Sequence, residues 1–314
     1  MPPGKEIIMT YDLIIIGSGP AGLSAAIYGK RAGLNLLVIE KNYMSGGQIL
    51  STYEVDNYLG LPGMNGFDMG MQFRAHADRL EVAFQEAEVT GIDNGRVKTI
   101  HTTAGDYKAY TVIFAMGAKH AHLNVSGEES LSGRGVSYCA TCDGAFFKNK
   151  TVAVVGGGDV ALEDAAFLAR YCTKVYLIHR RDELRGAKIL QKQLESLENV
   201  EILYSHTVQE ICGEEKVRGV LLENRKDSSR SKLEVEGVFI AVGMLPQTGW
   251  LPDWIVKDEK GYLVANEEGE TPAEGIFAAG DVRKKGLRQI ITAVSDGANA
   301  AISAANYVNK LSIS

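Results

Sequence analysis

Two short apolar segments, each followed by a glycine-rich turn and a helical run, constrain the fold of this chain more than any other feature. Residues 12–16 read DLIII and precede the turn GSGPAG at 17–22, and residues 151–155 read TVAVV and precede GGGDVA at 156–161. In this context the pattern G-x-G-x-x-G/A indicates a dinucleotide-binding unit. The first glycine makes the turn, the second admits a pyrophosphate, and the third small residue lets helix and strand pack closely. Two such units predict an α/β protein with two Rossmann-like, three-layer nucleotide-binding domains.

The residue that follows the second strand of each unit indicates which nucleotide the unit binds. These strands are expected at 35–39 (NLLVI) and 174–178 (KVYLI), so Glu40 and His179 occupy equivalent positions. A carboxylate there accepts both ribose hydroxyls of FAD or NAD. The second unit has no such acid and reads HRRDELR at 179–185, whose arginine forks suit a 2′-phosphate. The first unit is therefore expected to bind FAD and the second NADPH, because glycine turns of an unrelated protein would not show this opposite chemistry in register.

A single C-x-x-C sequence, Cys139 to Cys142, stands just before the second unit. In a chain without a secretory signal, such a pair indicates redox chemistry more strongly than it indicates a structural disulfide. A metal half-site is the alternative, but no second C-x-x-C or Cys/His partner completes tetrahedral ligation, so no metal is expected. Asp143 follows directly, and its position fits either a general acid or a helix-capping carboxylate.

Composition and charge exclude several classes of function. The 314 residues carry a net charge of −6, which leaves no basic footprint for nucleic acid and no polybasic anchor for a membrane surface. No apolar run is long enough to span a bilayer, and residues 1–10 lack the apolar core of a signal peptide, so a cytoplasmic protein is expected. Residues 1–8 are expected to be a dispensable extension or a misassigned start before Met9. Cys172 and Cys212 are expected to be buried free thiols.

The first unit is interrupted and later resumed. Residues 111–118 (TVIFAMGA) and 237–246 (GVFIAVGMLP) each predict a buried strand that ends in a glycine turn, and together they bracket the second unit. Such turns are suitable hinge points. We therefore expect an FAD-binding domain formed by residues 1–117 and 246–314, and an inserted NADPH-binding domain at 118–245 that carries the C-x-x-C pair.

The resumed part of the first unit contributes a further strand and a closing helix. Residues 275–281 read GIFAAGD, an apolar strand that ends at Asp281 and can bring this carboxylate to a ribityl or phosphate hydroxyl. Residues 289–309 predict a small-residue amphipathic helix. Its N-terminal amides could face a flavin ring, although plain packing accounts for most of its residues.

Taken together, these motifs resemble the low-molecular-weight, bacterial-type thioredoxin reductases. The resemblance extends in order over essentially the whole chain, without a large insertion. The matching segments are GSGPAGLSAAIY at 17–28, GGQI at 46–49, DNYLGLPG at 56–63, CATCDG at 139–144, GGGDVALEDA at 156–165, HRRDELR at 179–185, GIFAAGDVR at 275–283 and LRQIITAVSDGANAA at 287–301.

The resemblance implies two sets of nucleotide contacts. FAD contacts are expected from the first glycine turn and from residues that follow it: Gly17, Gly19, Pro20, Ala21, Glu40, Gly47, Gln48, Asn57, Asp281, Arg288 and Gln289. NADPH contacts are expected from the second turn and the arginine segment: Gly156, Gly158, Asp159, His179, Arg180, Arg181 and Arg185. The resemblance also implies a homodimer, a swivelling NADPH domain, and Cys142 as the cysteine nearest the flavin. Which cysteine attacks the partner stays open.

Four places depart from the family pattern. The chain passes between the two expected domains at two segments, which read Ala-Met-Gly at 115–117 and Ala-Val-Gly at 241–243. Ala-Thr-Gly is usual in the family at these places. Val160 stands where a small hydroxyl residue is common, and AVSDG at 293–297 replaces a sequence with two small residues before the glycine. None of these departures removes a phosphate ligand or a redox cysteine.

The implied activity is thioredoxin-disulfide reduction, with electrons passing from NADPH through FAD and the Cys139–Cys142 pair to oxidised thioredoxin. A related enzyme with ferredoxin as electron donor, or with another disulfide as acceptor, is the alternative. The arginine segment argues against a ferredoxin donor and against a dithiol oxidase that reduces O₂, because neither needs a 2′-phosphate site. A non-catalytic redox module would not need the cysteines together with Asp143.

Overall fold

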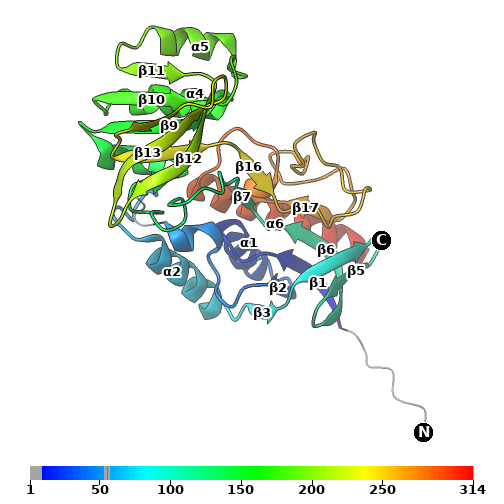
Figure 1. Cartoon of the computed structure of the whole chain (residues 1–314). Coiled ribbons are helices and arrows are strands. Elements are labelled where there is room, and N and C mark those ends of the chain that lie inside the picture. The colour runs from blue at the N-terminus through cyan, green and yellow to red at the C-terminus, as the bar shows by residue number, and fades with distance from the viewer. Residues whose placement is uncertain (1–8, 53–54, 56, 314) are drawn as a thin grey trace. The chain divides into compact units, whose positions relative to one another are not determined.

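The computed structural model describes residues 9–52, 55 and 57–313, so the expectation for residues 1–8 lies outside the described residues. The chain divides into two compact units (Figure 1). The outer unit comprises Met1–Lys119 and Leu245–Ser314, and the inserted unit comprises His120–Met244. The sequence placed these divisions at 117/118 and 245/246.

The described residues of the outer unit form a seven-stranded sheet in the order β3-β2-β1-β6-β5-β4, with β17 paired to β6. Strands β1, β2, β3, β6 and β17 are parallel, whereas β4 and β5 form an antiparallel extension. The strands are β1 (Thr10–Ile16), β2 (Leu36–Glu40), β3 (Ala83–Glu86), β4 (Val89–Asp93), β5 (Lys98–Thr102), β6 (Gly105–Phe114) and β17 (Ile276–Ala278).

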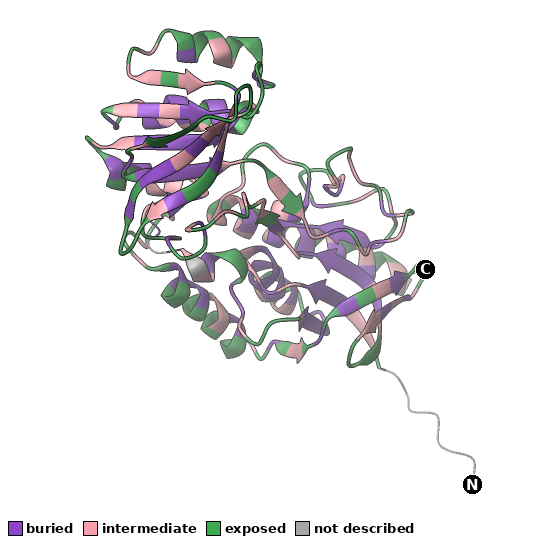
Figure 2. Ribbon diagram, in the orientation of Figure 1, coloured by how far each residue is buried: buried purple, intermediate pink, exposed green. Residues whose placement is uncertain are grey.

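Both faces of this sheet are buried, as Figure 2 shows for its central strands. Successive side chains of a strand point to opposite faces, so Leu13 and Ile15 pack on one side and Ile14 and Ile16 on the other. The first side is covered by α1 (Pro20–Arg31) and α6 (Ile290–Ile313), and the other by loop residues such as Leu251. Burial on both faces explains why β1 is a continuous apolar run rather than an alternating one.

The inserted unit has three layers. Its described residues form a parallel sheet in the order β11-β10-β9-β15-β8, with helices on one face and the antiparallel sheet β12-β13-β14 on the other. The parallel strands are β8 (Val136–Ser137), β9 (Thr151–Gly156), β10 (Lys174–Ile178), β11 (Val200–Leu203) and β15 (Gly237–Ala241). The antiparallel strands are β12 (His206–Gly213), β13 (Val217–Asn224) and β14 (Arg230–Leu233), and the helices are α4 (Asp159–Leu168) and α5 (Lys188–Glu195).

Shorter elements complete the two units. The outer unit adds α2 (Gly66–Arg79), η1 (Gly47–Ser51) and η3 (Gly280–Val282), and the inserted unit adds α3 (Ala140–Asp143) and η2 (Gly144–Phe147). None of the helices in the described part of the chain is both long and apolar enough to cross a bilayer.

The strands and helices predicted from periodicity are confirmed. The structure also shows how the two segments that pass between the domains fold. The second strand of the inserted unit is Lys174–Ile178, as predicted, and the closing helix runs past residue 309 to Ile313. Each predicted crossing strand ends before its glycine, because Gly117 and Gly243 have φ angles of 68° and 121° that a strand cannot continue through. Two short strands follow, β7 (Ala118–His120) and β16 (Met244–Pro246), and they pair with each other.

Candidate functional site

The C-x-x-C pair is closed as a disulfide at the beginning of a short helix. Cys139 and Cys142 have an S–S distance of 2.09 Å and a Cα–Cα distance of 5.3 Å, and Cys139 is the N-cap residue of α3. Both cysteines are half-buried. In the described part of the chain, no group of three or more His, Cys, Asp or Glu side chains could hold a metal ion.

Asp143 lies beside this disulfide and is held by a serine. The Ser137 hydroxyl donates to Asp143 Oδ2 at 2.6 Å and accepts from the Cys139 N–H at 3.0 Å. Burial raises the pKa of Asp143, and the hydrogen bond from Ser137 only partly opposes this. The Asp143 side chain makes no capping bond, which argues against the capping carboxylate, and the general-acid role stays a prediction. Sequence reasoning missed Ser137, because a serine six residues before an acid forms no recognisable motif.

A second polar cluster fixes the residue that precedes Cys139. The Tyr138 hydroxyl donates to Glu128 Oε1 at 2.8 Å, and His122 Nδ1 lies 3.1 Å from the same oxygen. Backbone N–H groups of residues 123–124 also donate to the buried Glu128 carboxylate. Although burial raises the pKa of Glu128, these hydrogen bonds outweigh it and lower the pKa. An ionised carboxylate therefore anchors the chain immediately before the redox pair.

The two remaining cysteines are free and lie on different elements. Cys172 is buried, its Sγ donates to the Phe147 carbonyl at 3.3 Å, and burial raises its pKa to about 11. The expectation of a buried thiol is confirmed for Cys172. It is wrong for Cys212, which is half-buried, because the β12–β13 register is interrupted between Cys212 and Gly213 at the end of the strand.

The first glycine turn has the space that a bound pyrophosphate needs. Gly17 has a φ angle of 102°, and a Cβ atom there would lie 2.5 Å from the Ala115 carbonyl oxygen. A Cβ at Gly22 would lie 1.9 Å from the Gly17 oxygen, so this third position requires a glycine for helix and strand to pack. A Cβ at Gly19 would meet nothing closer than 3.9 Å, which leaves an open surface above the N-terminus of α1. Pro20 begins that helix, and its missing N–H costs nothing there.

Glu40 stands at the end of β2 with both carboxylate oxygens occupied. Oε2 accepts from the Ser18 N–H and hydroxyl, each at 2.8 Å, and Oε1 accepts from the Asn42 N–H and amide, each at 2.9 Å. A carboxylate accepts about four hydrogen bonds. A ribose hydroxyl can therefore bind Glu40 only by replacing the Ser18 hydroxyl or the Asn42 amide, which the sequence did not indicate.

Four more of the residues expected at FAD, Gly47, Gln48, Asn57 and Gln289, make contacts within the outer unit. A Cβ at Gly47 would lie 3.3 Å from the Cα of Gly19, so the two turns are in contact. The Gln48 amide donates to the Ala118 carbonyl. The Asn57 amide donates to Gln289 Oε1 at 2.9 Å, although 232 residues separate them.

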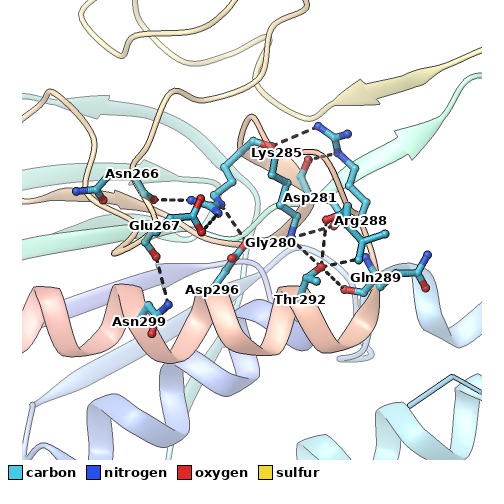
Figure 3. A network of polar contacts seen from close by, with 12 residues as sticks. Asn266, Glu267, Gly280, Asp281, Lys285, Arg288, Gln289, Thr292, Asp296 and Asn299 are labelled. Carbon is cyan, nitrogen blue, oxygen red and sulfur yellow. Dashed lines mark hydrogen bonds and ion pairs between the residues drawn. The ribbon is translucent and has the colours of Figure 1, made fainter. Parts of the chain in front are cut away.

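Asp281 offers a buried acceptor beside the same turn. Its Oδ1 is the buried side-chain oxygen that has no hydrogen-bond partner among the described residues, and the nearest cation, Lys285 Nζ, is 3.9 Å away (Figure 3). Burial raises the pKa of Asp281, opposed by Lys285 and Arg288. A Cβ at Gly280 would lie 2.8 Å from the Ala21 Cβ, so Asp281 is adjacent to the first turn. An unpartnered buried acceptor fits a ligand hydroxyl.

The unusual Asp296 in the AVSDG sequence has a structural explanation. Its Oδ2 accepts from Lys285 Nζ at 2.9 Å, from the Gly280 N–H at 3.0 Å and from Arg283 Nε at 3.2 Å (Figure 3). The side chains of Arg283, Lys285 and Asp296 are each more than nine-tenths buried. Two cations therefore compensate one buried carboxylate, and this group fixes the turn that carries Asp281. The nearby cations at 283 and 285 were the available sequence signal.

The second glycine turn is supported by a buried histidine. A Cβ at Gly156 would lie 2.5 Å from the Ala241 oxygen, and a Cβ at Gly157 would lie 2.2 Å from His179 Nδ1. A Cβ at Gly158 would meet nothing within 4 Å, which again leaves open space at the second glycine. His179 is only 4% exposed, its Nε2 contacts the Glu183 carbonyl at 3.0 Å, and burial lowers its pKa. His179 therefore packs against the turn from inside.

Three exposed arginines lie in the segment that is bonded to this turn. Arg180, Arg181 and Arg185 are exposed, and none of them is ion-paired with a carboxylate among the residues that the structure describes. The Arg185 N–H donates to the Gly157 carbonyl at 2.7 Å, and Asp159 Oδ1 accepts from the backbone of residue 187 at 2.7 Å. These bonds hold the arginine segment against the glycine turn, and the unpaired guanidinium groups remain available to an anion.

Two nucleotide-type glycine turns and a C-x-x-C disulfide in one chain define a nucleotide-dependent disulfide oxidoreductase. A family model described as pyridine nucleotide-disulphide oxidoreductase matches residues 11–297. The chain therefore belongs to the pyridine nucleotide-disulphide oxidoreductase family.

Several similar proteins carry the name thioredoxin reductase. A thioredoxin reductase of Listeria innocua is 46% identical over 303 residues, which cover 96% of this chain and 95% of that protein. A thioredoxin reductase of Bacillus subtilis is 44% identical, with 96% of each chain covered. The crystal structure of thioredoxin reductase from Streptococcus pyogenes superposes with a TM-score of 0.91 at 42% identity, covering 96% of this chain and 99% of that one.

Proposed function

We propose that this protein is a thioredoxin-disulfide reductase that uses FAD as its bound cofactor and NADPH as its electron donor. The observation that carries the proposal is the Cys139–Cys142 disulfide next to Asp143, in the same unit as a glycine turn bordered by exposed arginines. Relatives named thioredoxin reductase, 44–46% identical over nearly the whole chain, support the same activity.

The two cofactor sites are proposed to lie in different units. The outer unit is proposed to bind FAD, supported by the open space at Gly19 and by the unpartnered Oδ1 of Asp281. The inserted unit is proposed to bind NADPH, supported by the open space at Gly158 and by the exposed guanidinium groups of Arg180 and Arg181. The contrast between Glu40 and the arginines at the matching position supports this division.

The residues of the chain then carry the disulfide chemistry. When bound, FAD takes up a hydride from NADPH and supplies the electron pair to a disulfide. Two electrons and two protons convert the Cys139–Cys142 disulfide to two thiols, and Asp143 is placed to supply one of these protons. One cysteine thiolate attacks the disulfide of thioredoxin to form a mixed disulfide. The second cysteine resolves it, which restores the Cys139–Cys142 bond and releases reduced thioredoxin.

The proposal extends to the assembly and location of the enzyme. We infer a homodimer in the cytoplasm, with an NADPH-binding domain that swivels so that the nicotinamide and the dithiol reach the flavin in turn. The resemblance to the bacterial-type thioredoxin reductases supports the dimer and the swivel. The two free thiols, Cys172 and Cys212, are consistent with a reducing compartment.

Anaerobic reduction of the purified holoenzyme tests the proposal. NADPH is expected to bleach the flavin absorbance rapidly, NADH much more slowly, and added thioredoxin is expected to restore the absorbance. A glutaredoxin-like protein and a small disulfide, tested in parallel, identify the acceptor. An NADPH-treated enzyme that stays oxidised, but bleaches with reduced ferredoxin or a dithiol, would show that the donor is wrong.

A further inference from the structure

A turn of the three-stranded sheet is attached directly to the arginine segment. This turn joins β13 to β14, and Figure 1 shows β12 and β13 in the inserted unit that also holds β10. The Arg225 Nη1 donates to the Arg180 carbonyl at 3.2 Å, and the Arg225 N–H donates to the Ser205 carbonyl at 2.7 Å. The Ser205 N–H in turn donates to the Arg181 carbonyl at 3.1 Å. Arg225 therefore lies within one hydrogen bond of the first arginine.

Local hydrogen bonds set the shape of this turn. The Asn224 carbonyl accepts from the Ser228 N–H at 2.8 Å, and the Asn224 side chain accepts from the Lys226 N–H at 2.9 Å. The Asp227 carboxylate accepts from the N–H and the hydroxyl of Ser229. A turn held in this way presents Arg225 in a defined place before any ligand arrives, which reduces the entropy cost of binding.

The acidic residues near Arg225 are already engaged by other groups. Asp182 accepts from the Ser205 hydroxyl and pairs with Lys226 Nζ at 3.5 Å, and both contacts lower its pKa. Asp227 is bonded to Ser229. Arg225 is exposed, has no carboxylate partner among the described residues, and uses one of its five N–H donors on the Arg180 carbonyl. Its other guanidinium donors make no hydrogen bond to the described residues and are therefore available to a ligand.

We propose that Arg225 is a further specificity-determining residue, which binds the 2′-phosphate of NADPH together with Arg180 and Arg181. This inference rests on the proposed function, because it assigns a residue to the NADPH site of that enzyme. A 2′-phosphate is dianionic and has three acceptor oxygens, so a guanidinium on a neighbouring turn adds charge-assisted bonds that NADH cannot make. Sequence motifs omit Arg225, because it stands 40 residues after the end of the arginine segment.

Binding of 2′,5′-ADP and of 5′-AMP to the oxidised holoenzyme tests this assignment by calorimetry. Arg225→Gln keeps a side-chain donor for the Arg180 carbonyl and removes the charge, and Arg225→Lys keeps the charge. Arg218→Gln is the matched control, since Arg218 is an exposed arginine at the other end of β13, about 23 Å along the strand. Arg180→Gln/Arg181→Gln is the reference for loss of the proposed site.

Arg225→Gln is expected to weaken binding of 2′,5′-ADP about tenfold and to leave 5′-AMP unchanged, because one charge-assisted contact is lost. Arg218→Gln is expected to bind within about twofold of wild type, because it keeps the charge near the phosphate. Arg225→Lys is expected to bind more weakly than wild type but more tightly than Arg225→Gln, because it keeps the charge and loses the guanidinium fork. The loss should shrink at high salt, because the groups are exposed.

Two results would overturn the assignment. Unchanged 2′,5′-ADP binding in Arg225→Gln would show that the charge does not reach the phosphate, and equal weakening of both ligands would show that Arg225 only braces the turn. The Arg180→Gln/Arg181→Gln variant shows whether only the role of Arg225 is wrong or the proposed NADPH site as a whole. If Arg180→Gln/Arg181→Gln loses 2′,5′-ADP while Arg225→Gln does not, only the role of Arg225 is wrong. If neither loses it, the NADPH site itself is misplaced.

Discussion

Replacing Ser137 with alanine isolates the acid function proposed for Asp143. In the wild type, burial raises the pKa of Asp143 and the Ser137 hydroxyl, 2.6 Å from Oδ2, lowers it. Ser137→Ala removes the lowering interaction and leaves the burial. The pKa of Asp143 should therefore rise further, so that Asp143 keeps its proton to higher pH.

The size of the effect follows from the hydrogen bond that is lost. A hydrogen bond to a charged group contributes about 1.5–3 kcal/mol, and Asp143 is half-buried, so the lower end applies. About 1.4 kcal/mol corresponds to a factor of ten in the protonation equilibrium. We therefore expect roughly a tenfold shift toward protonated Asp143 at a given pH.

Stopped-flow spectroscopy at a series of pH values provides the measurement. The rate of the step in which the reduced holoenzyme opens the Cys139–Cys142 disulfide depends on a protonated acid, so its alkaline limb should move to higher pH in Ser137→Ala. Ser137→Thr keeps the hydroxyl and should restore the wild-type profile. Ser130→Ala removes an exposed hydroxyl of the same unit and should change nothing. An alkaline limb that stays in place, or moves to lower pH, would refute Asp143 as the acid that Ser137 controls.

Three further outcomes are expected. Cys142→Ser should leave NADPH-driven flavin bleaching intact and reduce thioredoxin reduction to background; loss of both would place this cysteine elsewhere in the cycle. Asp296→Ala should lower the free energy of unfolding by about 1.5–3 kcal/mol in urea titration, because Arg283 and Lys285 lose their buried hydrogen-bonded carboxylate and keep only Glu267 at 3.1 Å and Asp281 at 3.9 Å as counter-charges; an unchanged midpoint would contradict the compensation. The lowered pKa of Glu128 means that its stabilising contribution is present above the unfolded-state pKa and is lost as pH falls through the folded-state pKa. Glu128→Gln should therefore lower the melting temperature at neutral pH and flatten its decrease in acid, whereas an unaltered acid slope would show that another group controls it.

Much of the fold was available from the sequence because its signals are local. A glycine turn between an apolar strand and a helix requires nearby backbone atoms, and Gly22 shows this, because a Cβ atom there would lie 1.9 Å from the Gly17 oxygen. The strand at 174–178 was predicted correctly for the same reason. The C-x-x-C spacing likewise places two cysteines one helical turn apart whatever the rest of the chain does.

The partners of the site residues could not be predicted in this way. Asn57 meets Gln289 across 232 residues, and Arg225 meets Arg180 across 45, because the chain returns to the same place after forming other elements. Glu40 looked like an open acceptor for ribose, but Ser18 and Asn42 occupy its oxygens. Such contacts depend on where distant backbone segments come together, which periodicity and spacing do not encode.

The redox pair shows most directly which properties follow from the sequence and which only from the tertiary structure. The sequence by itself determined that Cys139 and Cys142 can join and that an acid follows them, since both statements concern neighbours along the chain. Only the tertiary structure decided that Asp143 is half-buried, that the Ser137 hydroxyl donates to it, and that it makes no capping bond. Burial and hydrogen bonding set the pKa of a carboxyl group, and both are properties of the packed surroundings.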